Sequence, residues 1–199
     1  MVNIAVLVSG GGTNLQALID SERSGKITAG KITLVVASNE NAYALERAKK
    51  AGIETAVIRR KDYADQDACD RALVSCLKEK DIDMVILAGY LTILGETMIA
   101  AYRDRIINIH PSLIPSFCGK GFYGLRVHEA ALERGVKVTG ATVHLVNEIP
   151  DGGRILLQKA VEVREGDTPE ILQRRVMEEA EWILLPKAAQ MLAESLEEE

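Results

Sequence analysis

An asparagine and a histidine stand two residues apart at the end of an apolar segment. Residues 105–115 read RIINIHPSLIP, and on an extended chain Asn108 and His110 share one face. An amide donor beside an imidazole suits a reaction that builds negative charge on an oxygen while a proton moves. Asp151 follows in a glycine-rich turn, from which it could reach His110 only through the fold, raising the pKa of that histidine. Alternatively, His110 is a core residue at a strand end and Asp151 only forms a turn, and spacing alone leaves both interpretations open.

A second candidate site is the glycine-rich stretch SGGGTNLQ at residues 9–16. Glycines between a first buried strand and a first helix let backbone N–H groups approach an anion at the helix N-terminus. The third glycine of a dinucleotide fingerprint is replaced by Leu15, and no Gly-Lys-Ser/Thr of a P-loop follows. We therefore expect a single phosphate at Gly12, Thr13 and Asn14, the alternative being a tight turn without a ligand.

The elements that position these residues alternate regularly through the first half of the chain. Short apolar runs typical of buried strands occur at 4–8, 32–38, 54–60, 83–89 and 105–110, with helical segments between the first four. The helix after the second run is expected to end at Gly52, and Cys69, Leu73 and Leu77 share the apolar face of the next helix. This alternation predicts an α/β protein with an open, mostly parallel, twisted sheet flanked by helices and a Rossmann-like N-terminal half.

The second half of the chain has a different pattern. Residues 111–125 hold prolines and glycines typical of a long loop, and a short helix follows. Segments 140–148 and 154–163 are strand-like and are joined across IPDGG. Thr168 and Pro169 form a good N-cap and N1 pair for one long helix to about Leu192, with a frayed ESLEEE tail. We expect one domain over 1–199, with a phosphate-binding half at about 1–100 and a catalytic half at about 101–199.

Composition excludes several classes of protein. The formal net charge of −5 argues against a protein built to hold nucleic acid. The apolar run at the N-terminus is too short for a signal peptide or a membrane span. The three cysteines have neither a metal-binding spacing nor an even-numbered disulfide framework. These features predict a cytoplasmic protein without a metal site, a membrane or a nucleic-acid partner.

Several of these stretches together closely resemble the phosphoribosylglycinamide formyltransferases of purine biosynthesis. SGGGTNLQALI, LAGYLTIL, INIHPSLIP, GATVHLVNEIPDGG and ILLQ occur in the order of that family and span nearly the whole chain. The Asn-x-His-Pro-Ser motif and the distant Asp-Gly-Gly mark the wider group of folate-dependent formyltransferases. The N-terminal glycine turn followed by Thr-Asn narrows the resemblance to the glycinamide ribonucleotide branch.

The resemblance implies a reaction and a set of residues for it. The formyl group of 10-formyltetrahydrofolate, a co-substrate, would pass to the amine of glycinamide ribonucleotide, giving formylglycinamide ribonucleotide and tetrahydrofolate in de novo purine (IMP) biosynthesis. Asn108 and His110 would stabilise the oxyanion, His110 would also carry the proton, and Asp151 would keep His110 charged. The ribonucleotide would bind at Gly12, Thr13, Asn14 and Glu181. The folate would bind at Leu91, Thr92, Ile93, Leu94, Asn108, Asn147, Glu148, Ile149, Pro150 and Asp151.

The sequence departs from the family pattern at several positions. Thr92 and Gln66 stand where cations that meet the folate tail are common. The match at Glu181 needs a shift of one residue, and Trp182 occupies the place of a common histidine. Of the remaining histidines, His144 is expected to be structural and His128 to lie on a short helix near the mouth of the site.

Three other functions share parts of the pattern, and a homodimer is left open. A 10-formyltetrahydrofolate hydrolase would share the fold. Such enzymes generally carry a regulatory domain before the catalytic domain, whereas this sequence starts directly with its first predicted strand. A methionyl-tRNA formyltransferase would need a C-terminal RNA-binding domain. A non-catalytic module that binds a phosphorylated sugar would have no use for Asn108, His110 and Asp151 together.

Overall fold

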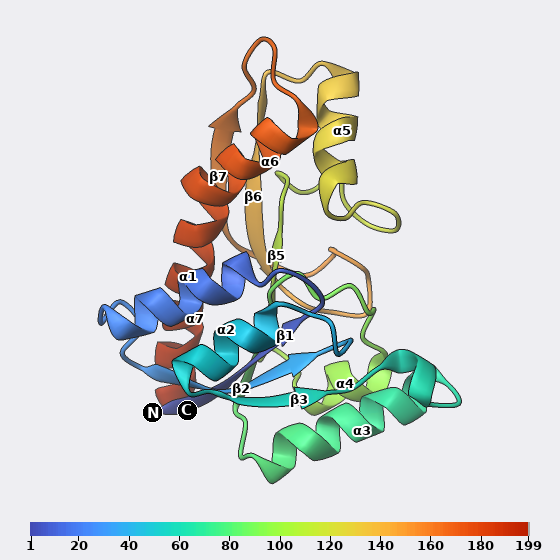
Figure 1. The fold of residues 1–199 in the computed structure, drawn as a ribbon, viewed down its shortest axis with the longest axis vertical. Coiled ribbons are helices and arrows are strands. Elements are labelled where there is room, and N and C mark those ends of the chain that lie inside the picture. The colour runs from blue at the N-terminus through green and yellow to red at the C-terminus, as the bar shows by residue number, and fades with distance from the viewer. Residues whose placement is uncertain (199) are drawn as a thin grey trace.

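One seven-stranded sheet runs through the computed structural model, which describes residues 1–198 (Figure 1). Glu199, the last residue of the predicted domain, lies outside the described residues. The sheet order is β3-β2-β1-β4-β5-β6-β7; the first five strands are parallel, and β6 and β7 are antiparallel to their neighbours. The strands are β1 Val2–Val8, β2 Gly30–Ala37, β3 Glu54–Val57, β4 Met84–Leu87, β5 Ile106–His110, β6 Val138–Leu145 and β7 Ile155–Glu162. The predicted open, mostly parallel α/β sheet is confirmed.

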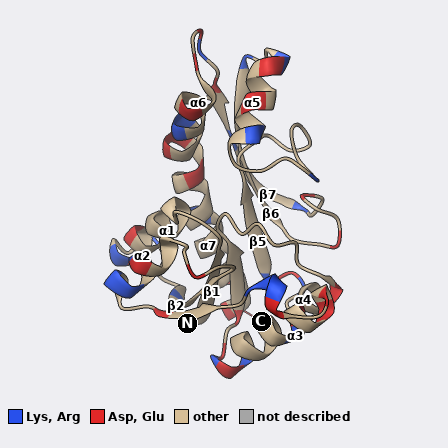
Figure 2. Ribbon diagram, turned by 45° about the vertical axis from the view of Figure 1, so that its right-hand side comes forward, with Lys and Arg blue, Asp and Glu red and all other residues tan. Residues whose placement is uncertain are grey.

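Helices cover both faces of the sheet. They are α1 Thr13–Arg23, α2 Ala44–Ala51, α3 Gln66–Glu79, α4 Glu96–Ala101, α5 Leu125–Arg134, α6 Pro169–Val176 and α7 Trp182–Glu197, with a 3₁₀ turn at Arg60–Asp62. One core lies between the sheet and α1, α2, α5, α6 and α7, and the other lies beneath α3 and α4. Charged residues lie mainly on the outer helices and loops, and the central strands carry few of them (Figure 2). No helix among the described residues is long and apolar enough to span a membrane.

The alternation of side chains in β1 explains its uninterrupted apolar sequence. Ile4, Val6 and Val8 belong to the first core, whereas Ala5 and Leu7 belong to the second. Because successive side chains of a strand point to opposite faces, a central strand covered on both sides must be apolar at every position. The strand predicted from this pattern is thereby confirmed and extended to Val2–Val8.

Local chemistry sets the ends of the helices. Gly52 takes the left-handed conformation after α2, with φ 75°, as expected for a C-cap. Thr168 caps α6 by accepting a hydrogen bond from the Ile171 N–H at 3.3 Å, and Pro169 occupies the first turn. Asp65 caps α3 in the same way through the Ala68 N–H at 2.7 Å.

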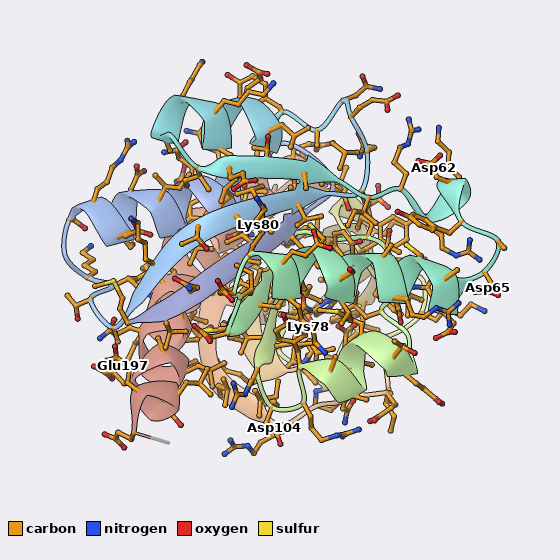
Figure 3. All side chains as sticks on the ribbon, turned by 90° about the horizontal axis from the view of Figure 1, so that it is seen from below. Asp62, Asp65, Lys78, Lys80, Asp104 and Glu197 are labelled. Carbon is orange, nitrogen blue, oxygen red and sulfur yellow. The ribbon has the colours of Figure 1, made fainter. Side chains whose placement is uncertain are left out.

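The single long helix predicted after Thr168 is wrong. A π-helical turn, Met177–Glu181, separates α6 from α7. The tail predicted to be frayed is helical to Glu197, whose carboxylate pairs with the amino group of Met1 at 2.8 Å. Glu197 can be followed in Figure 3, as can Lys80, which ties the end of α3 to Glu54 of β3 at 2.5 Å.

Candidate functional site

The structure brings Asn108, His110 and Asp151 together at the end of β5. Asn108 and His110 belong to β5, and the turn between β6 and β7 carries Asp151. The Asp151 Oδ2 lies 3.6 Å from the His110 Nδ1, so this carboxylate faces the imidazole directly. Its other oxygen, Oδ1, lies 3.5 Å from Nε2 of a further histidine, His144.

His144, expected from the sequence to be structural, is part of this cluster. Strand β6 pairs with β5 so that His144 stands directly opposite Asn108. The His144 Nδ1 lies 2.8 Å from the Leu145 carbonyl oxygen, which can only accept, so Nδ1 is the donor. In a neutral ring Nε2 is then an acceptor, and the Asn108 amide donates to it at 3.2 Å. One N–H of the Asn108 amide is thus held by His144, and the other is left to donate elsewhere.

The charge states of His110 and Asp151 follow from burial and from their contacts. Burial lowers the pKa of His110, and the opposing effects of Asp151 and the Phe117 carbonyl do not overcome it. Asp151 raises the pKa of His110, as expected, but burial is the larger effect, so the expectation that Asp151 keeps His110 charged is wrong. Burial also raises the pKa of Asp151, but the adjacent rings of His144 and His110 and the hydrogen bond from the Gly119 N–H outweigh it, and the pKa ends below its usual value. A neutral imidazole beside an ionised carboxylate is an arrangement suited to a general base.

The loop predicted at 111–125 lies against this cluster. The His110 Nε2 donates to the Phe117 carbonyl at 2.9 Å, and the Gly119 N–H donates to the Asp151 Oδ2 at 2.8 Å. The buried Thr142 of β6 anchors the start of the loop, because its hydroxyl donates to the Ser112 carbonyl at 2.7 Å. In this structure the loop therefore holds one nitrogen of His110 and one oxygen of Asp151.

The Asp-Gly-Gly sequence is required by the path of the turn. Asp151 has φ 54°, a conformation that aspartate tolerates better than most residues. A Cβ at Gly153 would stand 1.7 Å from the Leu145 carbonyl oxygen, closer than any real contact. Only glycine allows the chain to pass there and return as β7 while Asp151 faces His110.

The residues predicted to bind the ribonucleotide line one cavity of about 300 Å³ between the glycine turn and α6. Gly12, with φ 72°, directly precedes α1, and a Cβ on it would lie 2.6 Å from the Cβ of Ala44. In the described part of the chain no side chain caps α1, so its first N–H groups at Thr13 and Asn14 have no side-chain partner there. Unpaired N–H groups at a helix start, in a cavity, suit a phosphate.

Glu181 reaches this cavity from the π-helical turn. The Asn14 Nδ2 donates to the Glu181 Oε2 at 2.6 Å, and both side chains are buried. Burial raises the pKa of Glu181 to about 7, although the hydrogen bond from Asn14 opposes the change. A π turn holds more residues than an α turn. This turn lies at the position where the match at Glu181 needs a shift of one residue.

The ten residues predicted to contact the folate line a second cavity of about 130 Å³, together with His144. Three of its apolar side chains are more than half exposed: Leu91 at 61%, Ile93 at 64% and Ile149 at 65%. Apolar side chains at the rim of a cavity favour a flat, partly apolar ligand. Gln66 points its amide to Asp70 at 2.7 Å, and Glu148 pairs with Arg103 at 2.6 Å.

Comparison with known proteins assigns the chain to a family. A family model described as formyl transferase matches residues 2–188. The chain belongs to the formyltransferase family. It is 41% identical over 179 residues to the phosphoribosylglycinamide formyltransferase of Haemophilus influenzae, covering 90% of this chain and 82% of that protein. Glycinamide ribonucleotide transformylase 1 from Symbiobacterium toebii shares 44% identity and a TM-score of 0.92, over 98% of this chain and 89% of that one.

Some relatives in the formyltransferase family are much longer. The chain is 45% identical over 190 residues to the trifunctional purine biosynthetic protein adenosine-3 of Bos taurus, and it spans only 18% of that protein's length. Among residues 1–198, no group of three or more His, Cys, Asp or Glu side chains could hold a metal ion.

Proposed function

We propose that the protein transfers the formyl group of 10-formyltetrahydrofolate to the amine of glycinamide ribonucleotide in de novo purine biosynthesis. The observation that carries this proposal is that the two cavities meet at the Asn108–His110 segment. Asn108 lines the folate cavity, whereas Ile109 and Pro111 line the ribonucleotide cavity, and Leu91 lines both. A donor bound in one cavity and an acceptor bound in the other would therefore meet at this segment, where His110 lies buried between the lining residues Ile109 and Pro111.

Each catalytic side chain has a role that its contacts support. The substrate amine attacks the formyl carbon, and the carbonyl oxygen becomes an oxyanion that accepts a hydrogen bond from the free N–H of Asn108. The neutral His110 takes the proton that the amine loses, and Asp151 stabilises the resulting imidazolium. The proton then passes to N10 of the folate as the bond from the carbon to N10 breaks, which releases tetrahydrofolate and the formylated ribonucleotide.

This mechanism requires a rearrangement at His110. In the structure the proton of the ring lies on Nε2, because Nε2 donates to the carbonyl of Phe117. The acceptor nitrogen of the neutral ring is then Nδ1, which faces Asp151 and not the substrates. We infer that Phe117 withdraws when substrates bind and that the proton moves to Nδ1, so that Nε2 can act as the base.

The organisation of the chain that we propose is one domain in which both halves serve both sites. The half at about 1–100 supplies the glycine turn and Leu91–Leu94, and the half at about 101–199 supplies Glu181 and the catalytic residues. A cytoplasmic location and a homodimer stay predictions. Sedimentation of the purified protein would test the homodimer.

The test is to mix the purified protein with 10-formyltetrahydrofolate and follow tetrahydrofolate release with and without glycinamide ribonucleotide. Release that requires the ribonucleotide and is lost in His110→Ala supports the transferase. The matched control is Lys78→Ala. Lys78 is an exposed residue in the last turn of α3 (Figure 3), and this variant should retain full activity. Release without the ribonucleotide would indicate the hydrolase. Tight ribonucleotide binding by folded protein without any release would indicate the non-catalytic phosphosugar-binding module.

A further inference from the structure

Buried polar atoms without partners gather in the ribonucleotide cavity. Among residues 1–198, the Asn14 Oδ1 and both ring nitrogens of His128 have no hydrogen-bond partner, and both residues line this cavity. His128 lies near the start of α5 and is 0% exposed. Because buried polar groups are nearly always hydrogen-bonded, an imidazole with two orphaned nitrogens at a cavity indicates a ligand that satisfies it.

Two helices begin at this cavity. Gly12 precedes α1 and Gly124 precedes α5; both glycines line the cavity, and neither helix has a side-chain cap (α1 and α5 in Figure 1). The start of a helix carries a partial positive charge and unpaired N–H groups. The starts of α1 and α5 therefore both favour an anion in this cavity, and His128 lies near the start of α5.

The lining of the cavity lacks the residues that usually bind a phosphate. It includes no lysine and no arginine, so His128 is the one lining side chain that can become a cation, and Glu181 is the one lining acid. A ribonucleotide phosphate carries close to two negative charges at neutral pH. The partial charge of one helix start is smaller than that, which leaves a place for a positively charged side chain.

We propose that His128, as an imidazolium, binds the phosphate of the ribonucleotide together with the N–H groups at the start of α1. This inference rests on the proposed function, because it takes glycinamide ribonucleotide as the ligand. His128 would thereby select for a phosphorylated substrate, and it would be a binding residue that takes no part in the formyl transfer itself.

The charge state of His128 in the structure makes this contact measurable. Burial and the neighbouring His110 lower the pKa of His128 to about 4, so the ring is neutral near pH 7. The titratable groups around it are His110 at the end of β5 and Glu181 of the π turn, while α6 presents the neutral Gln173. A phosphate beside the ring favours its protonated form, so binding should raise the pKa of His128 and take up a proton.

The decisive experiment is an NMR titration of the imidazole rings, which is feasible because the chain has only three histidines. Spectra are recorded over pH for the free protein, with glycinamide ribonucleotide, and with the glycinamide ribonucleoside that lacks the phosphate. We expect the ribonucleotide alone to raise the pKa of His128 by more than about 2 pH units. An unchanged pKa, or an equal rise with the ribonucleoside, would overturn the proposal.

Variants supply the assignment and a second readout. His128→Gln should remove one ring signal, raise the KM for the ribonucleotide by about 10-fold or more, and leave kcat within about 2-fold at saturation. If that variant does not fold, the signals lost in His110→Gln and His144→Gln identify the third as His128, and the titration of the unaltered protein decides. Failure of formyl transfer in the unaltered protein would refute the proposed function. Transfer with no response at His128 would refute only this inference.

Discussion

The ribonucleotide cavity contains two buried groups whose pKa values lie on opposite sides of their ordinary values. The pKa of His128 is lowered by burial to about 4, and the pKa of Glu181 is raised by burial to about 7. Both side chains are almost fully buried, at 0% and 5% exposure, so solvent does little to screen them. Their titration should therefore change the free energy of unfolding.

The two contributions have opposite signs. The contribution of His128 is fully present above its unfolded pKa of 6.5 and is lost as the pH falls through about 4. The contribution of Glu181 is fully present below its unfolded pKa of 4.5 and is lost as the pH rises through about 7. Each pKa lies about 2.5 pH units from its ordinary value, and at about 1.36 kcal/mol per unit each effect is about 3 kcal/mol. Between about pH 4.5 and 6.5 the gain in unfolding free energy from His128 and the loss from Glu181 should nearly cancel as the pH rises.

Variants of one residue at a time should separate the two pH dependences of the unfolding free energy, which cancel in the unaltered protein. We expect the stability advantage of the unaltered protein over His128→Gln to grow by about 3 kcal/mol as the pH rises from 4 to 6.5. The unfolding free energy of Glu181→Gln, relative to that of the unaltered protein, should rise by about the same amount as the pH rises from 4.5 to 7. The assay is urea unfolding at steps of half a pH unit for the unaltered protein, the two single variants, the double variant and Lys78→Ala as a control.

The refuting result is specific to each group. If the difference in unfolding free energy between the unaltered protein and His128→Gln stays constant from pH 4 to 6.5, His128 is not held neutral by burial. In that case the inference that a phosphate must charge it loses its basis. A constant difference for Glu181→Gln would likewise mean that its carboxyl group ionises normally in the folded protein.

Other perturbations test the catalytic cluster and the turn beside it. Asn108→Ala should lower kcat by about 10²–10³-fold, the usual effect of losing an oxyanion donor, while changing the unfolding free energy by only about 1 kcal/mol. His144→Leu should lower kcat by freeing the Asn108 amide, and His144→Gln, which keeps an acceptor, should restore part of it at an unchanged KM. The pH profile of kcat/KM should rise to a plateau with a midpoint below 6.5, because burial lowers the pKa of His110. Gly153→Ala should destabilise the protein by more than about 2 kcal/mol in thermal unfolding, since its Cβ would meet the Leu145 carbonyl oxygen.

The sheet and part of the site could be predicted because they depend on local patterns. An apolar run such as Ile4–Val8 indicates a strand buried on both faces, and an i, i+2 pair indicates two side chains on one face. His144 could not be found in this way, because it meets Asn108 through the antiparallel register of β5 with β6. That pairing joins residues 36 positions apart and is set by packing.

The wrong expectation for the charge of His110 has a related cause. From the sequence, Asp151 is a nearby negative charge, which favours the imidazolium. The depth at which β5, the loop at Phe117 and β6 bury the ring is a property of the folded chain, and desolvation is the larger effect. The consequence for the mechanism is substantial. A neutral His110 needs only to move its ring proton from Nε2 to Nδ1 before Nε2 can accept the proton of the attacking amine, whereas a charged His110 would first have to lose a proton to another group.

The π turn at Met177–Glu181 lies where the match to the family pattern needs a shift of one residue. The residues of α6 before the turn and of α7 after it bury their apolar faces in the same core, so both helices must keep their positions against the sheet. An extra residue between them cannot be absorbed by rotating either helix without exposing that core. It is absorbed instead in the five residues Met177–Glu181, where the wider turn directs Glu181 at Asn14 and leaves Trp182 at the start of α7. In the sequence alone, the match at Glu181 shows only a shift of one position. In the structure, the packing of α6 and α7 on both sides confines the wider turn to Met177–Glu181, the segment that borders the ribonucleotide cavity.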